Sequence, residues 1–151
     1  MKKFRFRLET LLKFRKMEEE QAQIKMAEAN IRLYKEKELL TQFQNKLISS
    51  LHLLSKEQND GSPTIEILKT FHYYIDKLKG DITKQHEQVA KAETYRQECL
   101  NVLEAAVKQR KLVDNLRKKR LEQYNIELLQ EEQKILDELG TQAFMRNKES
   151  E

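Results

Sequence analysis

The chain has 151 residues with a formal net charge of +4, and 36% of them are charged while 38% are apolar. Three Gly, one Pro and no Trp leave too few turn-forming residues for an ordinary compact domain, and this composition is typical of long helices. Charges interrupt the basic N-terminus and no run of 18 apolar residues occurs, so neither a signal peptide nor a membrane span is expected. The single cysteine, Cys99, fits a reducing compartment, and we expect a cytoplasmic protein.

The first predicted element is one long helix over about residues 4–57. A 4-3 spacing that starts at Leu8 continues for more than six heptads, and ten of its fourteen positions are apolar. This sustained period and the low net charge argue against disorder. The fourteen positions are Leu8, Leu12, Arg15, Glu19, Ala22, Met26, Ala29, Leu33, Glu36, Leu40, Phe43, Leu47, Ser50 and Leu54.

A turn is predicted at residues 58–63, where Asn, Asp, Gly, Ser and Pro gather. Ser62 fits an N-cap, Pro63 the first helical residue, and Glu66 lies near the capping-box position.

The second predicted helix covers about residues 63–139. Its apolar register slips near Leu116, which indicates a stutter or a change of partner. Gly80 lies inside the helix at a cost of about 1 kcal/mol relative to Ala, and we expect the helix to continue through it. Gly140 fits a C-cap, so residues 140–151 are predicted to be a frayed tail.

These elements predict an all-α fold with a single domain over residues 1–151, a long antiparallel two-helix coiled-coil hairpin whose second helix overhangs. If Glu57 faces Thr64, then Leu8 faces Val113 and the second helix overhangs beyond Lys119. An exposed apolar stripe on the overhang would mark a binding surface or an oligomer seam. Its residues are Leu121, Tyr124, Leu128, Leu129, Ile135, Leu136 and Leu139.

Catalysis is not expected, because a two-helix hairpin has no pocket that could shift a pKa by burial. His52, His72 and His86 lie far apart in the sequence, and no Gly-rich phosphate loop occurs. We therefore expect no enzyme activity, no cofactor, no metal and no small-molecule substrate.

Residues 108–120 contain seven basic residues and one acid, followed by Leu121, Leu128 and Ile135 at heptad spacing, as in a basic-region zipper. The zipper would be shorter than three heptads and the basic stretch lacks a base-reading pattern. We therefore expect no nucleic-acid partner, although this function stays an alternative.

Two ends of the hairpin have compositions suited to partners. The N-terminal turns are basic and lie beside residues 108–120, which favours a negatively charged partner there.

Near the hairpin tip, Phe71, His72, Tyr73 and Tyr74 place four rings within one helical turn, and a two-helix seam cannot bury four consecutive side chains. At least two rings should face solvent or a partner.

The N-terminal pattern resembles that of the flagellar FliJ family, the small coiled-coil proteins of the flagellar type III export apparatus. It comprises Phe4-x-Phe6-x-Leu8-x-x-Leu11-Leu12-x-x-Arg15-x-x-Glu18, and Glu132-Gln133-Lys134-x-x-Asp137-Glu138 resembles the family's closing motif. The similarity in length and in helix–turn–helix layout covers nearly the whole chain.

The resemblance implies an export factor or general chaperone at the cytoplasmic face of the membrane that supports flagellum assembly and motility. Its implied partners are the hexameric export ATPase, the export-gate membrane protein and substrate-specific export chaperones. We expect the gate to contact Phe71, His72, Tyr73 and Tyr74. The expected ATPase-binding residues are Phe4, Phe6, Leu8, Leu12, Arg15, Leu121, Tyr124, Leu128, Ile135 and Leu139. A homodimeric coiled-coil spacer or tether, in which two overhangs pair, is the alternative.

Overall fold

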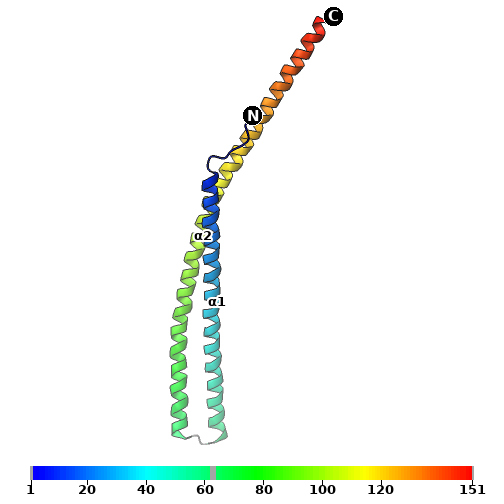
Figure 1. The fold of residues 1–151 in the computed structure, drawn as a ribbon. Coiled ribbons are helices and arrows are strands. Elements are labelled where there is room, and N and C mark those ends of the chain that lie inside the picture. Colours follow the sequence, from blue (N-terminus) through cyan, green and yellow to red (C-terminus); the bar gives the residue numbers. More distant parts are fainter. Residues whose placement is uncertain (1, 62–63, 151) are drawn as a thin grey trace. The chain divides into compact units, whose positions relative to one another are not determined.

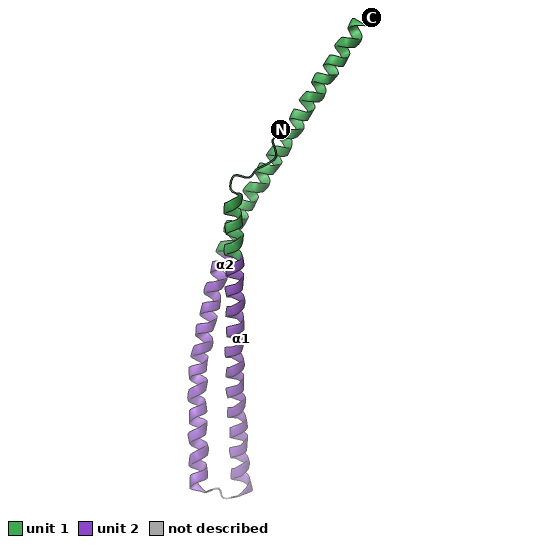
Figure 2. Ribbon diagram, viewed as in Figure 1, with its two compact units in different colours: residues 1–19, 105–151 green, residues 20–104 purple. Residues whose placement is uncertain are grey.

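A computed structural model describes residues 2–61 and 64–150 and contains two long helices, α1 (Glu9–Asp60) and α2 (Ile65–Glu149), with no strand in these residues (Figure 1). The helices run antiparallel as a coiled-coil hairpin, as the sequence predicts. The chain divides into two compact units, residues 20–104 and residues 1–19 with 105–151 (Figure 2). We call these the tip unit and the base unit. None of the helices in the described residues combines the length and apolar character that crossing a membrane requires.

The seam between α1 and α2 follows the 4-3 spacing of the sequence. Of the fourteen predicted α1 positions, all except Leu8 are buried or half-buried. On α2 the seam continues through Ile75, Leu78 and Ala92. Small side chains at Ala22, Ala29, Ala92 and Cys99 alternate with the larger Leu and Ile side chains that fill the core.

The seam of α2 also includes polar positions that the apolar pattern does not reveal. Gln85 is buried, and Arg96, Arg110 and Arg117 are half-buried at the same spacing. In the base unit the half-buried residues of α2 are 106, 107, 110, 113, 114, 117, 121, 124 and 128. Both members of the adjacent pairs 106/107 and 113/114 are half-buried, and the change of register that the sequence predicts near Leu116 stays a prediction.

The predicted start of the first helix at Phe4 is wrong. Residues 2–6 have no regular secondary structure, a turn follows in which the Glu9 amide donates to the Phe6 carbonyl (3.2 Å), and α1 begins at Glu9. Apolar and basic residues alternate with a period of two from Lys3 to Leu8, which fits an extended segment better than a helix. The acidic Glu9 is favoured in a first helical turn, and the preceding arginines are not.

The start of α2 also differs from the prediction. Thr64 is the N-cap: its Oγ1 accepts a hydrogen bond from the Ile67 amide (3.3 Å) and its carbonyl accepts one from the Leu68 amide (3.1 Å). Ser62 and Pro63, the predicted N-cap and first helical residue, lie outside the described residues. The first helix extends to Asp60, three residues beyond the predicted end.

The predicted C-cap at Gly140 and the frayed tail are wrong, because α2 continues through Gly140 to Glu149. Gly140 has no left-handed backbone, and the Thr141 hydroxyl donates to the Asp137 carbonyl (2.8 Å) within the same helix. The preceding and following residues are helix formers, and one Gly costs only about 1 kcal/mol. Gly80 is likewise helical, as predicted.

Candidate functional site

The base unit contains a non-helical N-terminal segment, residues 2–8, which we call the strap. Its backbone contacts α2 through Tyr124, whose hydroxyl donates a hydrogen bond to the Lys2 carbonyl (2.9 Å). The Phe4 ring lies 5.6 Å from the Tyr124 ring, centroid to centroid, in a tilted arrangement. The strap is therefore attached to α2 by one hydrogen bond and one aromatic contact.

The strap and α2 together line a groove. Lys2 contacts Tyr124 and Leu8 lines the groove with Leu116, so the strap follows α2 at least from residue 116 to residue 124. For this reason the overhang does not begin after Lys119, as the helical alignment predicts, but beyond the strap. The groove is lined by Phe4, Arg5, Phe6, Arg7, Leu8, Leu116, Arg120, Gln123, Tyr124 and Glu127.

Beyond the strap, α2 exposes a series of apolar side chains that nothing in the described residues covers. Leu128 is the last half-buried residue, and every residue from 129 to 150 is exposed. Ile135 and Leu139, two of the predicted ATPase-binding residues, are 57% and 54% exposed. Phe144 and Met145 join this surface, and the sequence analysis missed them because it ended the helix at Gly140. We call the exposed apolar residues Leu129, Ile135, Leu136, Leu139, Phe144 and Met145 the distal stripe.

The other predicted ATPase-binding residues are in the base unit but differ in accessibility. Leu12 is only 2% exposed and belongs to the core. Arg15 is half-buried and pairs with Glu18 (2.9 Å). Phe4, Phe6, Leu121 and Tyr124 are half-buried around the strap, and Leu8 is exposed at its end.

Two ion pairs join α1 to α2 near the strap. Arg117 pairs with Glu9 (3.2 Å), and Arg110 pairs with Glu19. Both arginines occupy seam positions where an apolar residue would be usual. Each ion pair therefore gives a half-buried guanidinium a charged partner.

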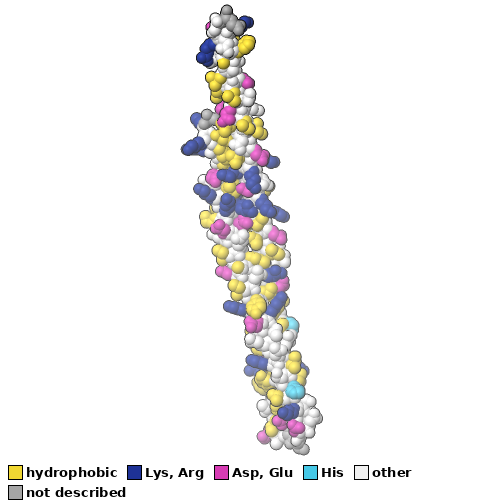
Figure 3. All heavy atoms as spheres, turned by 90° about the vertical axis from the view of Figure 1, so that its right-hand side faces the viewer, with side chains coloured by type: hydrophobic (Ala, Val, Ile, Leu, Met, Phe, Trp, Pro, Cys, Tyr) yellow, Lys and Arg dark blue, Asp and Glu magenta, His cyan; other side chains and the backbone are white. Residues whose placement is uncertain are grey.

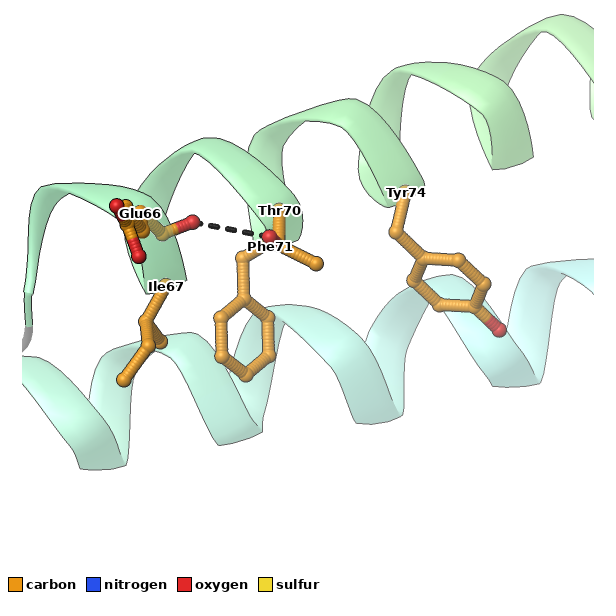
Figure 4. A pocket seen from close by; sticks show the side chains of 5 residues that line it. All are labelled: Glu66, Ile67, Thr70, Phe71 and Tyr74. Atoms are coloured by element: carbon orange, nitrogen blue, oxygen red, sulfur yellow. Dashed lines mark hydrogen bonds between the residues drawn. The ribbon is translucent and has the colours of Figure 1, made fainter.

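In the tip unit, the four predicted rings have different environments. Phe71 is half-buried and its ring points toward α1, whereas Tyr73 is 74% exposed and His72 and Tyr74 are also exposed (Figure 4). The prediction that at least two rings face solvent is confirmed. A shallow groove beside them is lined by Glu66, Ile67, Thr70, Phe71 and Tyr74.

Titratable groups with a perturbed pKa lie in the tip unit. The Arg96 side chain hydrogen-bonds to Glu93 (2.8 Å) and lowers the pKa of that carboxyl. A hydrogen bond with Cys99 raises the pKa of Tyr95, whose ring also lies 5.9 Å from the Arg32 guanidinium. Within residues 2–61 and 64–150, no three His, Cys, Asp or Glu side chains gather as metal ligands would.

Comparisons with known proteins give one match. The family model described as Flagellar FliJ protein matches residues 4–149. A search of curated proteins finds no match, and neither does a search of solved structures.

Proposed function

Since the chain belongs to the flagellar FliJ family, we propose that it binds the hexameric export ATPase as a shaft and contacts the export gate with its tip. The family is a non-enzymatic component of flagellar export, and its members associate with proteins of the export apparatus. A peripheral position at the cytoplasmic face of the membrane and an interaction with substrate-specific export chaperones belong to the same proposal. These two rest on the family alone.

The distal stripe is the observation that supports ATPase binding most strongly. Its large apolar side chains are exposed along one continuous helix, and solvent-exposed apolar surface of this extent is typical of a binding surface. The strap adds Phe4, Phe6 and Leu8, which line the groove with Tyr124. Leu12 belongs to the core of the base unit, Arg15 pairs with Glu18 within α1, and Leu121 and Leu128 are half-buried on α2.

A shaft of this kind would act by changing the relative stabilities of the ATPase conformations, and it would make or break no covalent bond. A single asymmetric rod inside a sixfold ring contacts the six subunits unequally. Unequal contacts give the subunits different nucleotide affinities, and only such differential binding can shift a conformational equilibrium.

Direct binding tests the ATPase contact. Ile135→Asp with Leu139→Asp should abolish capture of the export ATPase, because both charges would enter an apolar contact. The matched control is Ile24→Asp with Ile31→Asp in the tip unit, where the side chains are 59% and 55% exposed. Equal capture by all variants would refute the distal stripe as the docking surface.

The gate contact has its own test. Tyr73→Ala with Tyr74→Ala should weaken binding to the cytoplasmic part of the export gate, since exposed tyrosines are frequent contact anchors. Capture of the ATPase should be unchanged, and Tyr34→Ala, an exposed ring elsewhere in the tip unit, should leave both interactions intact. Loss of both interactions together would indicate a folding defect.

The alternative, a homodimeric tether, uses the same stripe differently. Two distal stripes would pair as a self-complementary seam. Sedimentation of the protein alone separates the two functions: a shaft is monomeric without its ring, whereas a tether is a stable dimer that Ile135→Asp converts to monomer.

A further inference from the structure

One part of the base unit contains a strong excess of positive charge. Residues 2–19 and 105–120, which we call the basic base, contain fourteen Lys or Arg residues and four acids. The whole chain has a net charge of only +4, so the rest of the molecule is net acidic. The positive charge of the chain is therefore concentrated in the basic base.

The four acids of the basic base are already neutralised within it. Each forms an ion pair with a cation of the same region, so none of them offsets the remaining cations at contact distance. The pairs are Glu9 with Arg117 (3.2 Å), Glu18 with Arg15 (2.9 Å), Asp114 with Lys118 (3.5 Å) and Glu19 with Arg110.

Ten cations of the basic base are left, and all of them are exposed. None makes an ion pair with another described residue. They are Lys2, Lys3, Arg5, Arg7, Lys13, Lys16, Lys108, Lys111, Lys119 and Arg120. Held within one small unit, these like charges repel each other, and a negatively charged surface would relieve the repulsion.

The positions of these cations suit an extended, flat partner. In the strap, Phe4 and Phe6 are half-buried while Arg5 and Arg7 are exposed, and both arginines line the groove together with Arg120 of α2. On the helices, Lys13 and Lys16 are three residues apart, as are Lys108 and Lys111, and each pair shares one helix face. Figure 3 shows Lys and Arg side chains crowded in a band across the middle of the visible face, with some Asp and Glu side chains among them.

We propose that the basic base is a docking surface for an anionic phospholipid bilayer. Seven of the ten cations are lysines, whose compact ammonium groups suit delocalised attraction to a charged surface, whereas arginine predominates where phosphates are recognised in bidentate geometry. Clusters of four to eight basic residues bind the anionic cytoplasmic leaflet in this manner. This proposal rests on the proposed peripheral position at the cytoplasmic face of the membrane, where such a leaflet is present.

Vesicle co-sedimentation of the full-length protein tests this proposal. The protein should bind phosphatidylcholine vesicles that contain phosphatidylglycerol and should not bind vesicles of phosphatidylcholine alone. Raising the salt from about 0.1 M to about 1 M should release the protein from the vesicles, because the Debye length falls to about 3 Å at the higher concentration. Neither measurement requires a variant, so neither depends on how a variant folds.

Charge-neutralising variants locate the surface. Lys13→Gln, Lys16→Gln, Lys108→Gln and Lys111→Gln together should weaken binding about fivefold for each lysine removed. Gln is a good helix former and its introduction reduces repulsion, so the variant should remain folded. The matched control changes four exposed lysines of the tip unit, Lys56→Gln, Lys69→Gln, Lys77→Gln and Lys84→Gln, and should bind as the unchanged protein does.

Three results would overturn the proposal: equal binding to neutral vesicles, equal loss in both lysine variants, or tighter binding to duplex RNA than to anionic vesicles. The last would assign the basic base to nucleic acid. These readouts contain no ATPase, so their outcome is separate from that of the shaft proposal.

Discussion

The side-chain amide of Gln85 donates hydrogen bonds to both the backbone carbonyl (2.9 Å) and the carboxylate of Glu36, across the seam between the two helices of the tip unit. Gln85 is 6% exposed and Glu36 is half-buried. A heptad slip would separate the buried amide from the Glu36 carboxylate. This pair therefore favours the observed alignment of α1 with α2 in the tip unit.

A double-mutant cycle measures this coupling. Gln85→Ala, Glu36→Ala and the double variant should show a coupling free energy of about 1–2 kcal/mol in urea unfolding followed by circular dichroism. The backbone carbonyl of residue 36 persists in every variant, so the cycle reports the carboxylate contact alone. Additive effects within about 0.5 kcal/mol would contradict this role.

Gly80 offers a stabilising substitution. It is exposed within α2 and an added Cβ would meet no atom within 4 Å, so Gly80→Ala should raise the free energy of unfolding by about 1 kcal/mol. Gly140→Ala is the matched control, because Gly140 lies in the uncovered part of α2. It should raise local amide-exchange protection without moving the urea midpoint. A lower midpoint for Gly80→Ala would indicate that Gly80 is needed as a break.

The strap should be held by the contacts of Tyr124. Phe4→Ala removes the ring contact, and Tyr124→Phe removes the hydroxyl that donates to the Lys2 carbonyl. Each change should lower the free energy that holds the strap on α2 by about 0.5–1.5 kcal/mol. Trypsin cleavage after Arg5 and Arg7 should accelerate up to about tenfold in Phe4→Ala and less in Tyr124→Phe, as measured by mass spectrometry. Cleavage after Arg146 is the internal reference, and unchanged strap cleavage would contradict the docked strap.

The Glu93 carboxyl gives a pH-dependent prediction. The Arg96 hydrogen bond lowers the pKa of Glu93, so its contribution to stability is present above the pKa of the unfolded chain. That contribution is lost as the pH falls through the lower folded pKa. In Arg96→Gln the pKa of Glu93 should return upward toward its ordinary value in an NMR titration. An unaltered titration curve would assign the shift to another cause.

The seam of α1 was predictable from the sequence because a heptad period leaves one solution for which residues face a partner helix. Even its polar members Arg15, Glu19 and Glu36 fell at the predicted positions. The fold class needed only this periodicity and one turn.

The strap and the end of the distal stripe, Phe144 and Met145, were mispredicted for physical reasons. Phe4 and Leu8 lie four residues apart, as a helix allows, but the period of two through Phe6 does not suit a helix, and the segment packs against Tyr124 in a non-helical form. Gly140 was taken for a C-cap because glycine is common there, yet nothing in the sequence forces the helix to end. The partners of Arg110 and Arg117 lie about a hundred residues away, and no local pattern reveals them.

ATP hydrolysis by the export ATPase tests the shaft most directly. The full-length protein is compared with a chain that ends at Gln130, which keeps the strap and its platform and lacks most of the distal stripe. The account predicts stimulation by the full chain and its loss on truncation, because the stripe would enter the ring. Undiminished stimulation by the truncated chain would contradict it.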